Sequence, residues 1–304
     1  MKSFAITATI VSLALIEAAA CRGADETNVL QQVVSLGLPK LSSELPTYYS
    51  EGAKARAERI EASIADMIAF YRERLGIQES INLAVLNEKD WKSVNPNPYG
   101  LPNAYGPPPV IFMPATTGGF AFHLMEARKD AIPADVLKAY LETNHTTFET
   151  ASEDFVDAIG FHELGHALCL RYGIDPQCRW LNEFIASYFE YAYISERRPD
   201  SKRVFDLLGR PSWARPKNRT LADFERLYSG VDDLGWYHGM FETRIRELYP
   251  KMGLQFLKEL RGQFPAAAGD HQGVFVPTPV PPEQLLEELE KIAPGFKDWA
   301  TGFR

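Results

Sequence analysis

The sequence has few cysteines, no excess of positive charge and no apolar run long enough to cross a bilayer. Only 3 of the 304 residues are cysteine, which excludes a small scaffold held together by several disulfides. Lys and Arg total 32 against 40 Asp and Glu, giving a net charge of −8, so broad binding to nucleic acid or to an anionic membrane is not expected. Hydrophobic residues make up 45% and aromatic residues 12%, which excludes intrinsic disorder as the main state.

The first residues have the pattern of an export signal. A lysine at position 2 precedes an apolar run from Phe4 to Ile16, and small residues follow at 18–20. The 13 residues of this run are too few to span a bilayer as a helix. We therefore expect a signal peptide over residues 1–20 and a protein that is periplasmic, extracellular or anchored to the cell envelope.

The three cysteines divide into one beside the export signal and two farther along the chain. Cys21 follows three alanines, as in a bacterial lipobox, although Ala18 stands where such a site usually has leucine. Lipid attachment at Cys21 and plain secretion are therefore open alternatives. Cys169 and Cys178 form an even remainder, which in an exported protein is a candidate disulfide, with two buried free thiols as the alternative.

Periodicity predicts a small N-terminal half that contains strands. Apolar residues at helical spacing predict a helix over 53–75, and alternation predicts a strand over 81–86. Six prolines predict an irregular loop over 95–109. Val110–Met113 is predicted to be another strand, and its flanking prolines favour a position at the edge of the sheet.

Helical patterns dominate after residue 134. They predict helices over 154–172, 180–196, 236–248, 254–260 and 283–292. No flexible linker separates the two halves, so residues 21–304 are expected to form a single domain with two lobes. The predicted fold class is α+β, with a small N-terminal sheet and a mostly helical C-terminal lobe.

The strongest functional motif is H-E-x-x-H, at His162-Glu163-Leu164-Gly165-His166. Positions i and i+4 lie on the same face of a helix, so both imidazoles can reach one metal ion, and Glu163 is placed to contact a water on that ion. The alternative is two surface histidines on an amphipathic helix. The nearly uncharged flanks disfavour it, because such a helix carries charge on its exposed face.

A catalytic zinc site needs a third protein ligand and an open fourth position. The best candidate is Glu183, 17 residues beyond His166, because a helix–turn–helix hairpin of that length can return a carboxylate to the first helix. The alternative is a glutamate favoured near a helix N-terminus by the helix dipole. His162, His166 and Glu183 are the predicted ligands of one Zn²⁺ ion.

In these motif residues the sequence resembles a known family, the gluzincin metallopeptidases. H-E-x-x-H followed by Trp180-Leu181-Asn182-Glu183 is similar to the motifs of the aminopeptidase branch, and Asn-Glu also begins the third-ligand motif of the thermolysin branch. The resemblance implies a zincin-like fold with an active-site helix and an edge strand. It also implies that His162, His166 and Glu183 bind zinc and that Glu163 is the general base.

The chain also departs from the aminopeptidase pattern. The segment that anchors a substrate's free amine in that branch is not found, and Pro114–Phe120 stands upstream instead. An endopeptidase is therefore favoured over an aminopeptidase. Ser187 occupies the position where thermolysin-like enzymes place an aspartate that orients a zinc-binding histidine, a role that another acid or a carbonyl could take.

Hydrolysis also requires a donor for the oxyanion. The family supplies a tyrosine or histidine from a later helix, and here Gly235–Met240 contains both Tyr237 and His238. Tyr237 is favoured over His238, and either residue could instead pack in the core. The predicted function is a zinc-dependent hydrolase, acting on a peptide or protein substrate through a metal-activated water with Glu163 as base. An inactive metallopeptidase-like binding module and a zinc hydrolase of a non-peptide bond are the alternatives.

Overall fold

The computed structural model describes residues 29–208, 210–211, 216–227, 231–266 and 280–303. The expected signal peptide and Cys21 lie outside these residues. Among the helices within them, none combines the length and the apolar character that a bilayer crossing requires.

The strands form one four-stranded sheet in the order β1-β2-β4-β3. Their bounds are Thr47–Tyr49 for β1, Asn82–Leu86 for β2, Asn103–Tyr105 for β3 and Val110–Pro114 for β4. The pairs β1–β2 and β2–β4 are parallel, whereas β3 runs antiparallel to β4, with Ala104 opposite Ile111. Both central strands, β2 and β4, are buried along their whole length.

The prediction that Val110–Met113 lies at the sheet edge is wrong, because β4 lies between β2 and β3. The prolines before it, at 107–109, belong to the turn that joins β3 to β4, and Pro114 is the last residue of the strand. The next amide, that of Ala115, donates to the Leu86 carbonyl at 2.8 Å, so the flanking prolines leave the inner ladder intact. The edge strand next to β4 is β3, inside the segment predicted to be an irregular loop, and β1 is at the other edge.

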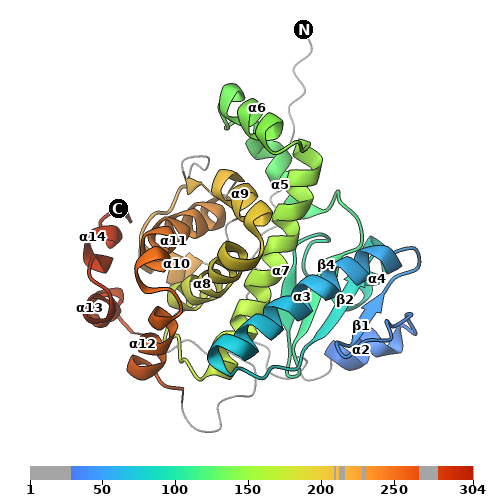
Figure 1. Cartoon of the computed structure of the whole chain (residues 1–304), viewed down its shortest axis with the longest axis horizontal. Coiled ribbons are helices and arrows are strands. Elements are labelled where there is room, and N and C mark those ends of the chain that lie inside the picture. Colours follow the sequence, from blue (N-terminus) through green and yellow to red (C-terminus); the bar gives the residue numbers. More distant parts are fainter. Residues whose placement is uncertain (1–28, 209, 212–215, 228–230, 267–279, 304) are drawn as a thin grey trace.

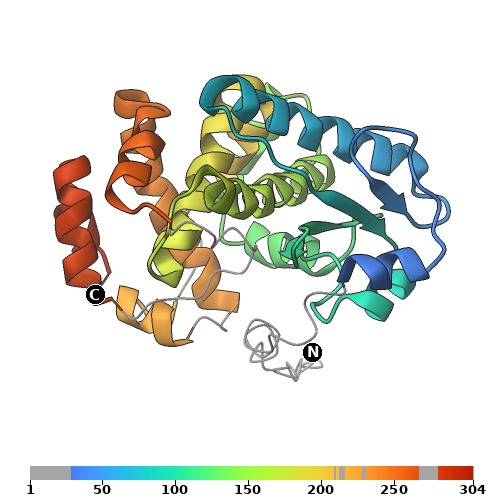
Figure 2. The same cartoon turned by 90° about the horizontal axis from the view of Figure 1, so that it is seen from below.

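Helices cover both faces of the sheet (Figures 1 and 2). On one face, residues 83, 85, 111 and 113 belong to the main core with residues of α3 (Lys54–Leu75) and α7 (Phe148–Tyr172). On the other face, residues 84, 86, 110 and 112 pack against α2 (Val29–Ser35) and α4 (Glu88–Val94). Two covered faces explain why β2 and β4 are apolar throughout rather than alternating with exposed polar residues.

The long helix α7 contains H-E-x-x-H. It ends, as predicted, at Gly173, which has a left-handed backbone with φ 83° and is therefore well suited to glycine. Its start lies six residues before the predicted one, at Phe148 rather than Asp154, because the Thr147 side chain accepts the N–H of Thr150 and caps the helix. The acid-rich first turns lack the apolar spacing on which the prediction depended.

The C-terminal lobe is helical, as predicted. Its elements are α8 (Arg179–Arg197), α9 (Pro199–Leu208), α10 (Leu221–Leu227), α11 (Val231–Met252), α12 (Gln255–Gln263), α13 (Pro282–Ile292) and α14 (Phe296–Ala300). In Figure 1, α7 runs between the sheet and these helices. Two further helices, α5 (Phe120–Lys129) and α6 (Ala134–Thr143), extend beside the N-terminal half of α7. The α+β prediction is confirmed, with few strands and many helices.

Candidate metal centre

The three predicted ligands meet where α7 and α8 pack against each other. His162 and His166 lie on successive turns of α7, and Glu183 lies in the second turn of α8. One ligand atom from each residue can be chosen so that all lie within 4.8 Å of one another. The Glu183 Oε2 atom is 2.9 Å from His162 Nε2 and 3.5 Å from His166 Nε2. Both imidazoles therefore face the same carboxylate oxygen.

A glycine allows this convergence. A Cβ atom on Gly165 would lie 2.6 Å from the carbonyl oxygen of Ala186, on α8. Only glycine lets the two helix backbones approach so closely. Gly165, the residue before His166 in the motif, therefore sets how closely α8, which carries Glu183, approaches the two histidines.

The outer nitrogen of His162 faces two polar groups on α8. Ser187 Oγ is 3.2 Å from His162 Nδ1, and Glu190 Oε2 is 3.8 Å from the same atom. Ser187 and Glu190 follow Glu183 by about one and two helical turns, so all three share a face of α8. A hydrogen bond at Nδ1 fixes the ring and leaves Nε2 directed at Glu183.

Burial and mutual contact shift the pKa values of the three residues in different directions. Burial by itself raises the pKa of Glu183, but the charge of His166 and hydrogen bonds from both imidazoles outweigh it and hold that pKa well below its usual range. Burial lowers the pKa of His162. For His166 the effect of burial is outweighed by Glu183, which raises the pKa to about 9.

Glu163 links this cluster to the edge strand. Its half-buried carboxyl group lies close to the backbone N–H of Ala104, on β3. Burial raises the pKa of Glu163 to about 8, although the charge of His166 opposes the shift. The residue next to the first histidine therefore stands between the histidines and β3.

Of the two candidate oxyanion donors, the structure brings His238 to the cluster. His238 Nε2 is 3.7 Å from Glu183 Oε2, and its ring centroid is 5.2 Å from that of His162. The Tyr237 hydroxyl instead donates to the carbonyl of Thr220 at 2.9 Å, and its buried ring stacks on Phe303. Tyr237 and His238 are adjacent on α11 but point to different sides of the helix. The sequence alone does not tell which of them faces the cluster.

Cys169, in the last turns of α7, and Cys178, just before α8, are free and buried, so no disulfide joins them. The Cys169 thiol faces the Ile174 carbonyl at 3.8 Å, within its own helix end. Cys178 is the residue immediately before α8 and contacts Glu225 through its side chain. The two thiols thus contact different groups, and the α7–α8 turn is held without a disulfide.

Two partners of the site were not assigned from the sequence. Glu190 carried a weak signal, because its spacing of seven residues from Glu183 places it on the same face of α8. Ala104 carried none, since a strand of three residues among prolines shows no alternation.

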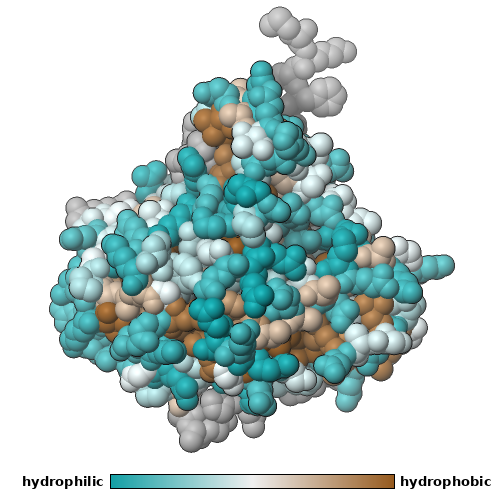
Figure 3. Space-filling view, viewed as in Figure 1, coloured by the Kyte–Doolittle hydropathy of each residue, from teal (hydrophilic) through white to brown (hydrophobic). Residues whose placement is uncertain are grey.

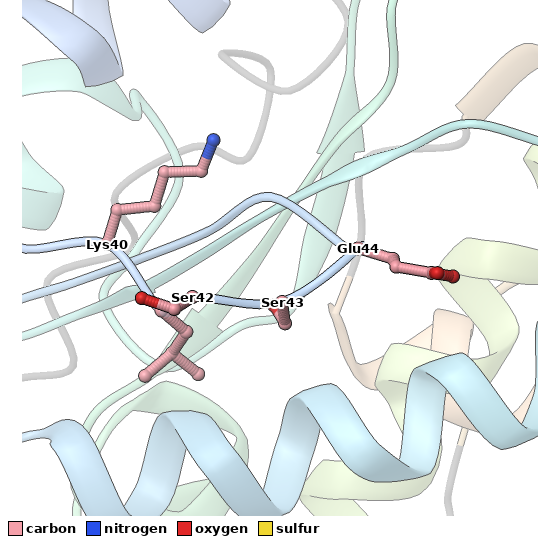
Figure 4. Close-up of a pocket in the computed structure, with 5 residues that line it drawn as sticks. Lys40, Ser42, Ser43 and Glu44 are labelled. Carbon is pink, nitrogen blue, oxygen red and sulfur yellow. The ribbon is translucent and has the colours of Figure 1, made fainter.

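A depression lined by Lys40, Leu41, Ser42, Ser43 and Glu44 lies in the segment before β1, and none of the candidate ligands lines it (Figure 4). The face seen in Figure 3 is mostly hydrophilic, with apolar residues gathered in its lower part.

The donor set fits a divalent metal ion. Two imidazole nitrogens and one carboxylate oxygen are the ligands of a zinc site with a fourth position open. Tetrahedral ligands at about 2.0–2.2 Å from an ion stand about 3.3–3.6 Å apart. The two distances from Glu183 are 2.9 and 3.5 Å, and all three ligand atoms lie within 4.8 Å of one another. His162 also has the outer hydrogen-bond partner that metal-binding histidines require.

Comparison with known proteins gives no match: neither protein-family models, nor curated proteins, nor solved structures match this chain. The resemblance to gluzincins accordingly rests on the motif residues, and the cluster of His162, His166 and Glu183 rests on the structure.

Proposed function

We propose that the protein is a zinc-dependent hydrolase and that its substrate is a peptide or protein. The observation that carries the proposal is the meeting of His162, His166 and Glu183, with the carboxyl group of Glu163 directly beside them. The three ligands account for a metal site. Glu163 provides the additional base that hydrolysis requires and that metal binding alone does not.

A zinc ion held by the three ligands would polarise the scissile carbonyl and lower the pKa of water at the open position. The Glu163 carboxylate takes a proton from the attacking water and later delivers it to the leaving amine. His238, next to the cluster on the α11 side, donates from its ring to the developing oxyanion. This assignment favours His238 over Tyr237, whose hydroxyl is bonded to Thr220.

The edge strand β3 supplies a place for an extended substrate. Ala104 lies beside Glu163, and β3 is at one edge of the described sheet, next to β4. A peptide that adds to this edge through main-chain hydrogen bonds would pass directly by Glu163. This geometry supports cleavage within a chain that adds to the edge at β3.

The test combines metal analysis with a Glu163→Gln variant on a peptide library. We expect about one zinc per chain in both proteins and a rate of cleavage that falls by roughly 10²–10⁴-fold in the variant, since a general base contributes about that much. Glu149→Gln, an exposed change near the start of the same helix, serves as the matched control and should keep full activity.

Each other outcome identifies a rival. Bound zinc without cleavage of any peptide by the wild type contradicts the peptidase and favours a binding module or hydrolysis of another bond. Cleavage that survives in Glu163→Gln contradicts the role of Glu163. Absence of bound metal after dialysis against zinc contradicts the metal site itself.

We also propose that the chain is exported, on the pattern of residues 1–20. Mass spectrometry of the mature N-terminus tests this, because a start at Cys21 with an added lipid mass, a start at Cys21 without it and an uncleaved chain are distinguishable. An uncleaved chain recovered from the cytoplasm contradicts export.

A further inference from the structure

The short helix α10 contacts the first turn of the helix that carries Glu183. The Glu225 carboxylate accepts the backbone N–H of Trp180 at 2.7 Å and that of Arg179 at 3.1 Å. The Arg179 guanidinium donates in return to the backbone carbonyl of Glu225 at 3.4 Å. Three hydrogen bonds therefore join residues about 45 positions apart in the chain.

These bonds replace a cap that the local sequence does not supply. The first N–H groups of a helix have no partner within the helix, and a Ser, Thr, Asp or Asn before the first turn usually accepts them. At α8 that position is Cys178, whose side chain makes no capping hydrogen bond. A carboxylate from a different helix performs the task instead, with charge that suits the positive end of the helix dipole.

The capped turn is next to the third metal ligand. Glu183 follows Arg179 by four residues, about 6 Å along the helix axis at 1.5 Å per residue. Trp180, whose N–H bonds to Glu225, is fully buried, so the first turn of α8 is fixed on its core side as well. A shift of this turn moves Glu183 relative to His162 and His166, which belong to a different helix.

The same short helix also contacts the other side of the site. The Thr220 carbonyl, immediately before α10, accepts the Tyr237 hydroxyl at 2.9 Å. The Phe224 ring packs edge-on against Tyr237, with centroids 4.9 Å apart. Since Tyr237 precedes His238 on α11, α10 joins the start of the Glu183 helix to the segment that presents His238.

We propose that Glu225 is a positioning residue for Glu183. Its carboxylate fastens the first turn of α8, so that Glu183 stands where the two histidines can share its ion. The inference rests on the proposed metal site. It differs from an ordinary helix cap in its consequence, because a cap that only stabilises the fold leaves the metal affinity of the folded protein unchanged.

The experiment measures the zinc dissociation constant of the full chain by competition with a chromophoric chelator, well below the melting temperature. Glu225→Gln keeps the shape of the side chain and removes its charge and one of its two acceptor oxygens. We expect its zinc dissociation constant to rise about tenfold, the lower end of the change seen when outer partners of metal ligands are replaced. Amide exchange at Arg179 and Trp180 should accelerate in the same variant.

The matched control is Asn87→Ala, which removes the side-chain cap of α4, where Asn87 accepts the N–H of Asp90. It lowers stability in the same way but touches neither ligand helix, so its zinc affinity should equal that of the wild type. Glu225→Asp, which keeps the charge on a shorter side chain, should recover part of the affinity lost in Glu225→Gln.

Equal zinc affinity in wild type and a folded Glu225→Gln overturns the positioning role. If Glu225→Gln does not fold, Glu225→Asp takes its place, with a weakening of about threefold expected and equal affinity overturning the inference. A parallel loss in Asn87→Ala also overturns it, because general destabilisation would then explain the effect. Failure of the wild type to bind zinc contradicts the metal site instead and is seen in the wild-type titration alone.

Discussion

The close approach of α7 and α8 at Gly165 can be tested by adding a single methyl group. In Gly165→Ala the new Cβ would lie 2.6 Å from the Ala186 carbonyl oxygen and 3.0 Å from the Ala186 Cα. These neighbours are backbone atoms, which cannot rotate away as the end of a side chain can. The two helices must therefore separate, and Glu183 moves with α8.

The size of the effect follows from the geometry. Ordinary contact begins near 3.4 Å, so the gap to the oxygen must grow by 3.4 − 2.6 = 0.8 Å. Overpacking of this kind costs about 1–3 kcal/mol, and the better helix propensity of alanine returns about 0.5–1 kcal/mol. We expect a net loss of about 0–2.5 kcal/mol and a fall in Tm of up to about 10 °C. Since metal–ligand distances tolerate about 0.2 Å, zinc affinity should fall at least about tenfold.

Thermal unfolding and zinc titration measure the two effects, and a second glycine supplies the control. Gly262, exposed near the end of α12, has no atom within 4 Å of an added Cβ. Gly262→Ala should therefore leave zinc affinity unchanged and keep or slightly raise Tm. If Gly165→Ala behaves like Gly262→Ala in both measurements, the helices do not approach as closely as described and the reasoning is refuted.

Two further predictions concern titration and the oxyanion donor. Burial raises the pKa of Asp154 from 3.8 to about 6, and the charges of Asp157 and Glu153 add to the shift. The charged form of Asp154 therefore opposes folding. The free energy of unfolding falls as pH rises from about 4 to 6. Asp154→Asn should therefore stabilise the protein by about 1–2 kcal/mol above pH 6, after allowance for partial exposure, and should have no effect below pH 4. Equal gains in Tm at both pH values would contradict this. For peptide cleavage, His238→Ala should lower kcat by about 10²–10³-fold, whereas Tyr237→Phe, whose hydroxyl bonds to Thr220, should lower it less than about tenfold. The reverse order in a steady-state assay would return the donor role to Tyr237.

Local sequence patterns predict some helices accurately but not the order of the strands. Helices with strong apolar periodicity and a glycine stop, such as α3 ending at Gly76, were predicted almost to the residue. The edge strand was missed and its neighbour misplaced, because the order of strands in a sheet depends on contacts between distant segments. Prolines disfavour the middle of a central strand. Those around β4 lie in the turn before it and at its last residue, so the strand itself can be central.

At the site, the sequence by itself determined the ligand types and their grouping. The i, i+4 spacing places His162 and His166 on one face of a helix because helical geometry is local. Spacing also made Glu163 and Glu183 candidates, and the resemblance to gluzincins implied their roles as general base and third ligand.

Only the tertiary structure decided what surrounds these residues. It placed Glu163 against Ala104, selected His238 rather than Tyr237 as the neighbour of Glu183, and left Cys169 and Cys178 unbridged. It also brought Glu225 to the start of α8 from about 45 residues away. Spacing along a helix fixes which side chains share a face, but which other element meets that face depends on how the whole core packs.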